Sequence, residues 1–160
     1  IVEAISGQKT VGFRAPRFQR PSLKIIKDLG FQYDSSLHPS PMPGRYSGKG
    51  KLVPHVDEES GLTVLPVSVV PGLRLPLSWI WFRMLPKGYM KWGASLVEAN
   101  FDYLCLYFHP WDFVDLSKYK SCLPAGFTIG GKSAINDMED FLKWGLGKGW
   151  KSMTIQDYLD

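Results

Sequence analysis

The alternation of apolar and polar residues predicts a β-α-β unit in the first part of the chain. Residues 10–14 (TVGFR) have the pattern of a short strand, which Pro16 ends. Apolar residues at helical spacing predict a helix over residues 21–30, and residues 31–34 (FQYD) predict the next strand. A strand, a helix and a strand in this order predict two parallel strands joined by a crossover helix.

The rest of the chain continues this alternation around two long loops. Residues 35–61, which are rich in Pro, Ser, Gly and Lys, are expected to form the first loop, and residues 110–132 the second. The order of elements predicts an α/β architecture in one domain, residues 1–160, and residues 1–5 have the pattern of the last turns of a helix. The other expected elements are a strand over 62–69, helices over 79–85 and 87–100, a strand over 102–108, a helix from the N-cap Ser133 to 144, a strand over 151–154 and a helical turn over 155–159.

Composition places the chain among globular domains and narrows its partners. Hydrophobic residues make up 44% of the 160 positions, which is enough for a core. No run of eighteen apolar residues occurs, so no membrane span is predicted. The formal net charge is +4, but Lys and Arg are dispersed, a pattern that does not favour a nucleic-acid partner. The two cysteines define neither a disulfide framework nor a metal site, and they do not indicate a cellular compartment.

His109 is the most prominent candidate for chemistry, because it directly follows the apolar strand expected over 102–108. In parallel α/β folds, sites form at the carboxyl ends of strands. A histidine there can act as a general acid or base, since its pKa lies near neutral pH. The alternative is a structural polar residue where a core strand reaches the surface. Trp111, two residues later, could stack on a sugar ring or close the end of the fold.

Arg14 and Asp34 follow the first two expected strands in the same way. The fork of Arg14 could orient a carboxylate, or it could form a surface ion pair. Asp34 could be a base, but a side-chain cap that holds the next two serines in a turn is favoured. The three histidines lie far apart in the sequence and show no HxxxH or HExxH spacing, so no metal site is predicted from this chain alone: His38, His55 and His109.

Three of these strand-end stretches, in this order, resemble polysaccharide deacetylases of carbohydrate esterase family four. Residues 11–18 (VGFRAPRF) resemble the Arg-x-Pro motif of that family, and residues 29–37 (LGFQYDSSL) resemble the segment that follows it. Residues 106–113 (LYFHPWDF) resemble its last catalytic motif, and residues 149–155 its terminal strand. The resemblance runs over nearly the whole chain.

The resemblance implies a distorted (β/α) barrel that removes acetyl groups from sugars, using a divalent metal, usually zinc, held by one Asp and two His. It implies that His109 is the general acid which protonates the leaving amine, and that Arg14 orients the catalytic aspartate. The expected partner is an N-acetylated polysaccharide or glycolipid. Four residues are expected to line the substrate site: Trp111, Phe18, Leu106 and Asp34.

The family's metal and base motifs belong before Arg14, and this chain does not contain them. The aspartate that tunes the acid histidine is not evident either, since residues 65–76 (LPVSVVPGLRLP) stand where it is expected. We therefore expect the carboxy-terminal portion of a deacetylase barrel that lacks its first strands. A missing amino-terminal segment or a second copy is expected to cover the open edges. Two alternatives are a non-catalytic carbohydrate-binding module of the same fold and an amidohydrolase acting on small amides.

Overall fold

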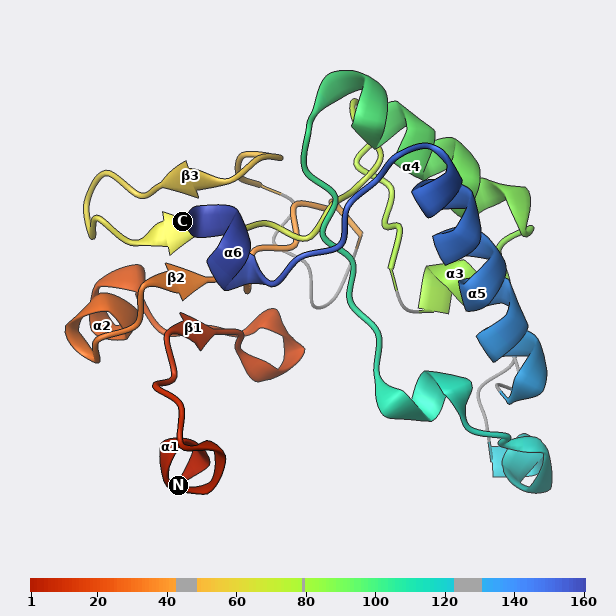
Figure 1. Ribbon diagram of the computed structural model, residues 1–160, viewed down its shortest axis with the longest axis horizontal. Coiled ribbons are helices and arrows are strands. Elements are labelled where there is room, and N and C mark those ends of the chain that lie inside the picture. Colours follow the sequence, from red (N-terminus) through yellow and green to blue (C-terminus); the bar gives the residue numbers. More distant parts are fainter. Residues whose placement is uncertain (43–48, 79, 123–130) are drawn as a thin grey trace.

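The computed structural model describes residues 1–42, 49–78, 80–122 and 131–160. In this part of the chain the fold is mixed α/β, with a four-stranded open sheet and several helices. The sheet lies on one side of the molecule and the helices α4 and α5 on the other, with long connecting segments between them (Figure 1). The chain thus has the α/β class that its sequence predicts.

The predicted β-α-β unit is confirmed. Strand β1 (Gly12–Phe13) pairs in parallel with β2 (Tyr33–Asp34), and helix α2 (Leu23–Asp28) connects them. The Ser22 side chain accepts a hydrogen bond from the backbone N–H of Ile25 at the start of α2. Strand β1 is an edge strand, so the backbone groups on its outer side are not used by the sheet.

The sheet continues from β2 to β4 and ends at β3, giving the order β1-β2-β4-β3. Strand β4 (Thr63–Val64) is parallel to β2 and covers only part of the strand expected over residues 62–69. Strand β3 (His55–Val56) is antiparallel to β4 and lies in a region where only a loop was predicted. The sheet is open, so the closed barrel implied by the resemblance is not formed by the described residues.

The helical side is built around α4 (Gly88–Asn100) and α5 (Lys132–Gly147). Ion pairs join Lys87 to Asp137 near their starts and Lys148 to Glu98 at their ends, so the two helices run in roughly the same direction. Their shared core contains six buried residues: Val70, Leu77, Met90, Ala94, Val97 and Phe141. Helix α5 begins one residue before Ser133, with Gly131 at its N-cap, so the predicted cap residue is wrong.

Several short elements complete the fold. They are the helices α1 (Val2–Ser6), α3 (Ile80–Met84) and α6 (Ile155–Leu159), and the 3₁₀ turns η1 (Pro16–Phe18), η2 (Pro110–Phe113) and η3 (Ser117–Cys122). Helices at the positions of α1, α3 and α6 are predicted by the sequence, although Trp79, the expected start of α3, lies outside the described residues. In the part of the chain that is described, no helix has the length and apolarity needed to cross a membrane.

The strand expected over residues 102–108 is wrong, because this segment joins no ladder with a neighbouring strand. Its backbone makes isolated hydrogen bonds instead, and two of them go to serine hydroxyl groups. Ser68 N–H donates to the Cys105 carbonyl (2.8 Å), and the Ser68 and Ser78 hydroxyls accept from the N–H groups of Cys105 (2.9 Å) and Tyr107 (3.1 Å). Residues 151–154 form no strand either. Without these two ladders the sheet cannot close.

Candidate functional site

The 102–108 segment separates two environments, because its side chains point alternately to opposite sides. Leu104 and Leu106 pack against the core of α4 and α5. Cys105 contacts Arg14, and Tyr107 contacts Phe18, so the odd-numbered residues reach the β1 and η1 side of the molecule. The continuous apolar run that predicted a strand is therefore explained by this two-sided packing, with one face for the core and the other for the candidate site.

Four rings form a continuous row on the site side, which we call the aromatic row: Phe18, Tyr107, His109 and Trp111. Successive ring centroids lie 5.0, 5.8 and 4.3 Å apart. The first two contacts are edge-on, whereas the His109 and Trp111 rings are stacked at 15°. Trp111 is 52% exposed, while Tyr107 is buried, so the row ends in an indole that solvent reaches. The structure thus brings together three of the predicted site residues.

The turn η2 fixes the position of His109. The backbone N–H of His109 donates to the Asp112 carboxylate (2.7 Å), and the N–H of Asp112 donates to the His109 carbonyl (2.9 Å). The same carboxylate oxygen lies 3.5 Å from Nδ1 of the imidazole, and Asp112 is only 1% exposed. Asp112 was not among the site residues expected from the sequence. The sequence contained the signal: Pro110 follows His109, and Asp112 stands three residues after His109. This spacing is typical of a capped turn.

Arg14 lies at the carboxyl end of β1, beside the aromatic row. Its Nε donates to the Ser35 carbonyl (2.8 Å) and its Nη2 to the Ser35 hydroxyl (2.6 Å), and Nη2 lies 3.5 Å from the Cys105 sulfur. Ser35 therefore fixes the plane of the guanidinium. Arg14 and Leu106 both line an open cavity of about 560 Å³, whose lining also includes residues 151–155. Leu106 thus belongs to this cavity and to the helical core, while His109 and Trp111 do not line it.

Asp34 makes the turn contacts that the sequence favours. Its carboxylate accepts from the Ser36 N–H (3.2 Å) and hydroxyl (2.5 Å), and Arg20 Nε lies 3.3 Å away. The Ser36 hydroxyl in turn accepts from the N–H of Ala15, which ties this turn to the start of η1. Asp34 is 0% exposed, so its role in this structure is to join the ends of β1 and β2. Direct contact with a substrate stays a prediction.

His38 is a second residue whose position the sequence analysis did not anticipate. It is 1% exposed, and its ring packs edge-on against Phe18 (5.4 Å) and Tyr107 (6.0 Å) behind the aromatic row. Burial lowers its pKa from 6.5 to about 4, and the charge of Arg14 adds to this effect. The imidazole is therefore neutral at pH 7. The sequence signal for this position was that His38 follows the Asp34 turn and precedes Pro39.

The described residues do not fit a metal centre. Among them, no group of three or more His, Cys, Asp or Glu side chains lies close enough together to hold a metal ion. His38 and His109 both contact Tyr107, and the Asp112 carboxylate lies beside His109. The ligand set of one Asp and two His that the resemblance implies is thus not supplied by this part of the chain.

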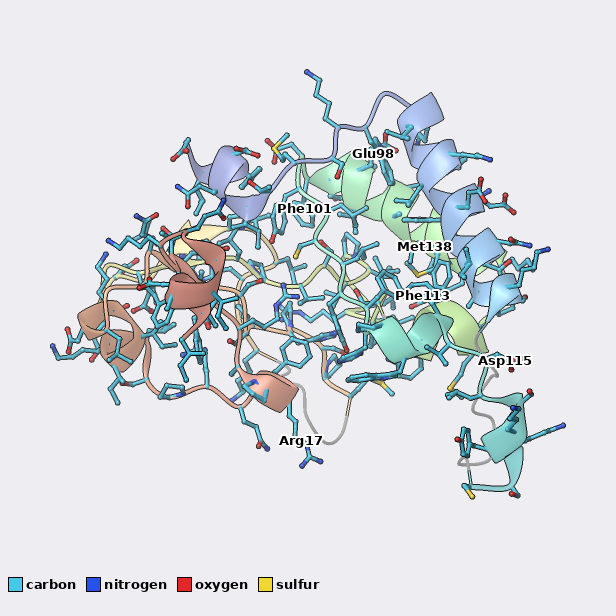
Figure 2. All side chains as sticks on the ribbon, turned by 60° about the horizontal axis from the view of Figure 1, so that its bottom comes forward. Arg17, Glu98, Phe101, Phe113, Asp115 and Met138 are labelled. Carbon is cyan, nitrogen blue, oxygen red and sulfur yellow. The ribbon has the colours of Figure 1, made fainter. Side chains whose placement is uncertain are left out.

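Figure 2 labels Arg17 on η1 and Phe113 on η2. No curated protein and no solved structure matches the chain. One family model matches residues 35–144, more than half of the 160 positions, and this range includes His38, Leu106, His109 and Trp111. The chain therefore belongs to the family described as "Domain of unknown function (DUF3473)".

Proposed function

We propose that this chain supplies the sugar-binding face and the proton donor of a carbohydrate N-deacetylase. The substrate is an N-acetylated polysaccharide or glycolipid, one sugar of which stacks on the solvent-exposed indole of Trp111 at the end of the aromatic row. His109 faces the scissile amide and acts as the general acid. The proposal joins the resemblance of three motifs to the arrangement of the rings around the 102–108 segment.

The single observation that carries this proposal is the exposed Trp111 stacked on His109. About half of the Trp111 surface is open to solvent, so the indole is available to a ligand. Its flat face matches the apolar face of a sugar ring. The His109 ring, whose centroid is 4.3 Å from that of Trp111, covers one face of the indole, so a sugar would stack on the opposite face and the next sugar of the chain would lie at the His109 imidazole.

The geometry around His109 supports the role of proton donor. The Asp112 carboxylate lies beside Nδ1, which leaves Nε2 as the nitrogen that can reach a substrate. In amide hydrolysis water adds to the acetyl carbon, the C–N bond breaks, and the leaving amine needs a proton. Protonated His109 would give that proton from Nε2 to the amine nitrogen. Asp112 would act as a positioning residue for the ring.

A second candidate function is a non-catalytic carbohydrate-binding module. It is favoured by the lack, among the described residues, of a cluster that could hold a metal. Deacetylation by the family's scheme needs a metal-activated water and a base, and His109 supplies neither. Both candidates require the same sugar-binding face, so binding and hydrolysis must be measured separately.

Binding of chitohexaose, measured by titration calorimetry, tests the shared part of the two candidates. We expect Trp111→Ala to weaken binding about tenfold or more, because the stacking surface is lost. Trp92→Ala is the matched control, since Trp92 is 47% exposed but lies on α4. No binding by the unaltered chain, or an equal loss in both variants, would refute the sugar-binding face.

Acetate release from chitohexaose by the full-length protein that contains this chain, with and without added zinc, then separates the two candidates. Release that His109→Ala abolishes and His55→Ala preserves supports the deacetylase. His55 is a suitable control because it lies on strand β3, where its Nδ1 contacts the Val53 carbonyl. Tight binding without acetate release under either condition favours the binding module.

A further inference from the structure

The Ser78 hydroxyl holds the end of the 102–108 segment, directly before the candidate proton donor. Its oxygen accepts a hydrogen bond from the Tyr107 backbone N–H (3.1 Å), and Ser78 is only 1% exposed. Water cannot readily take the place of a hydroxyl in so buried a position, so its loss would be costly. Since the segment joins no strand ladder in the described part of the chain, isolated bonds such as this one set its position.

Ser78 is itself held by well-packed surroundings. The preceding residue, Leu77, is fully buried in the core shared by α4 and α5. Pro76 forms a β-bridge with Val69, and its carbonyl accepts a hydrogen bond from the Tyr89 hydroxyl on α4 (2.7 Å). The Ser78 hydroxyl is therefore a fixed point that connects the helical core to the segment carrying the candidate site.

The position of Tyr107 decides where His109 lies relative to η1. The Tyr107 ring packs edge-on against the His109 ring, with centroids 5.8 Å apart, and against the Phe18 ring of η1, with centroids 5.0 Å apart. Within η2, by contrast, Trp111 stacks on His109, and Asp112 accepts from its backbone N–H. The turn η2 is therefore expected to move as a unit with His109 when the Tyr107 backbone moves.

We propose that Ser78 is a positioning residue that sets the place of His109 by fixing the Tyr107 backbone. This inference rests on the proposed deacetylase function and adds a residue, outside the three motifs, on which proton transfer depends. Without the Ser78 hydroxyl, η2 shifts as a unit relative to η1 and Arg14. The sugar then still stacks on Trp111, but Nε2 of His109 no longer reaches the leaving amine in the right geometry.

Acetate release from chitohexaose by the full-length protein that contains this chain measures the effect. We expect Ser78→Ala to lower kcat about tenfold or more and to change KM by less than about twofold. The reason is that a shift of about 1 Å can slow a positioned reaction by about 100-fold, whereas the stacking surface of Trp111 is kept. Ser78→Cys keeps the shape of the side chain but offers a weaker acceptor, so it should lower kcat in the same way even if Ser78→Ala is too unstable to assay.

Ser68→Ala is the matched control for a general loss of stability. Ser68 is also buried, and its hydroxyl accepts from the Cys105 N–H (2.9 Å) on the same segment. The backbone N–H of Ser68 donates to the Cys105 carbonyl (2.8 Å), so Cys105 keeps this bond after the substitution. Both alanine variants remove one buried hydroxyl and should lower the thermal midpoint of unfolding similarly, but only Ser78→Ala should lower kcat.

The possible failures are distinguishable. Equal kcat values for Ser78→Ala and Ser68→Ala, or an unchanged kcat in Ser78→Cys, overturn the positioning role while the deacetylase stands. A rise in KM without a fall in kcat also overturns it, because Ser78 would then act on sugar binding. Absence of acetate release from the unaltered full-length protein overturns both this inference and the proposed function.

Discussion

His38 should make the stability of this protein sensitive to mild acid. The imidazole lies 1% exposed behind the aromatic row, against Phe18 and Tyr107, and burial lowers its pKa from 6.5 to about 4. The unfolded chain takes up a proton at His38 near pH 6.5, whereas the folded protein resists protonation until about pH 4. The unfolded state therefore binds more protons in this window, and stability falls as the pH falls through it.

The magnitude follows from the difference between the two pKa values. One unit corresponds to about 1.4 kcal/mol, so the full difference corresponds to about 3 kcal/mol of unfolding free energy. Between about pH 7 and about pH 4.5, most of this contribution is lost, or about 2 kcal/mol. Below about pH 4 both states are protonated and the contribution of His38 no longer changes.

Urea unfolding of the unaltered chain and of His38→Phe, at several pH values across this window, measures the effect. Phenylalanine keeps a ring between Phe18 and Tyr107 but cannot titrate. The carboxylates that respond to acid are common to both proteins, so the difference between their pH profiles isolates His38. His55→Phe is the matched control, because this substitution removes a histidine that is not fully buried.

We expect the free energy of unfolding of His38→Phe to fall by about 2 kcal/mol less than that of the unaltered chain over the window. The His55→Phe profile should follow the unaltered chain. Parallel profiles for the unaltered chain and His38→Phe would refute the reasoning, because they would mean that His38 is protonated as readily in the folded protein as in the unfolded one.

Three further predictions concern the fold. Asp34→Asn should lower the free energy of unfolding by about 2 kcal/mol, because it weakens the buried contacts with Arg20 and Ser36. The control Asp28→Asn, on the surface, should lower it by less than about 0.5 kcal/mol, and equal losses in chemical denaturation would contradict this prediction. Gly93→Ala should lower the free energy of unfolding by about 1–3 kcal/mol, since a Cβ would lie 2.3 Å from Leu77 Cδ2. A Cβ at Gly88 meets no atom within 4 Å, so Gly88→Ala should show no such loss in thermal unfolding. Light scattering should detect species heavier than the 18.1 kDa monomer as concentration rises, because β1 is an open edge; a monomer at every concentration would count against self-association.

The local elements could be predicted where short-range chemistry decides them. Helix α2 follows from apolar spacing, and α6 begins at Ile155 after the N-cap Thr154, whose side chain forms a reciprocal cap with Asp157. Strand β3 could not be predicted, because His55 and Val56 are in a strand only through their partners on β4. The 102–108 segment shows the opposite case: its apolar run predicted a strand, but no neighbouring strand pairs with it.

The candidate site shows the same division. His109, Arg14 and Phe18 could be named from motifs, because each stands in a distinctive stretch of sequence. Asp112 and His38 were not identified, since their importance depends on what they touch: Nδ1 of His109 in one case and the ring of Tyr107 in the other.

The sequence by itself determined the α/β class, the parallel β-α-β unit and the main helices. These depend on the spacing of apolar residues and on caps within a few residues, which the order of the chain specifies directly. Only the tertiary structure decided that the sheet is open, that Asp34 is fully buried, and that Phe18, Tyr107, His109 and Trp111 form one row. The physical reason is that ladders, burial and ring contacts join residues far apart in the chain, and their free energy exists only when both partners are in place.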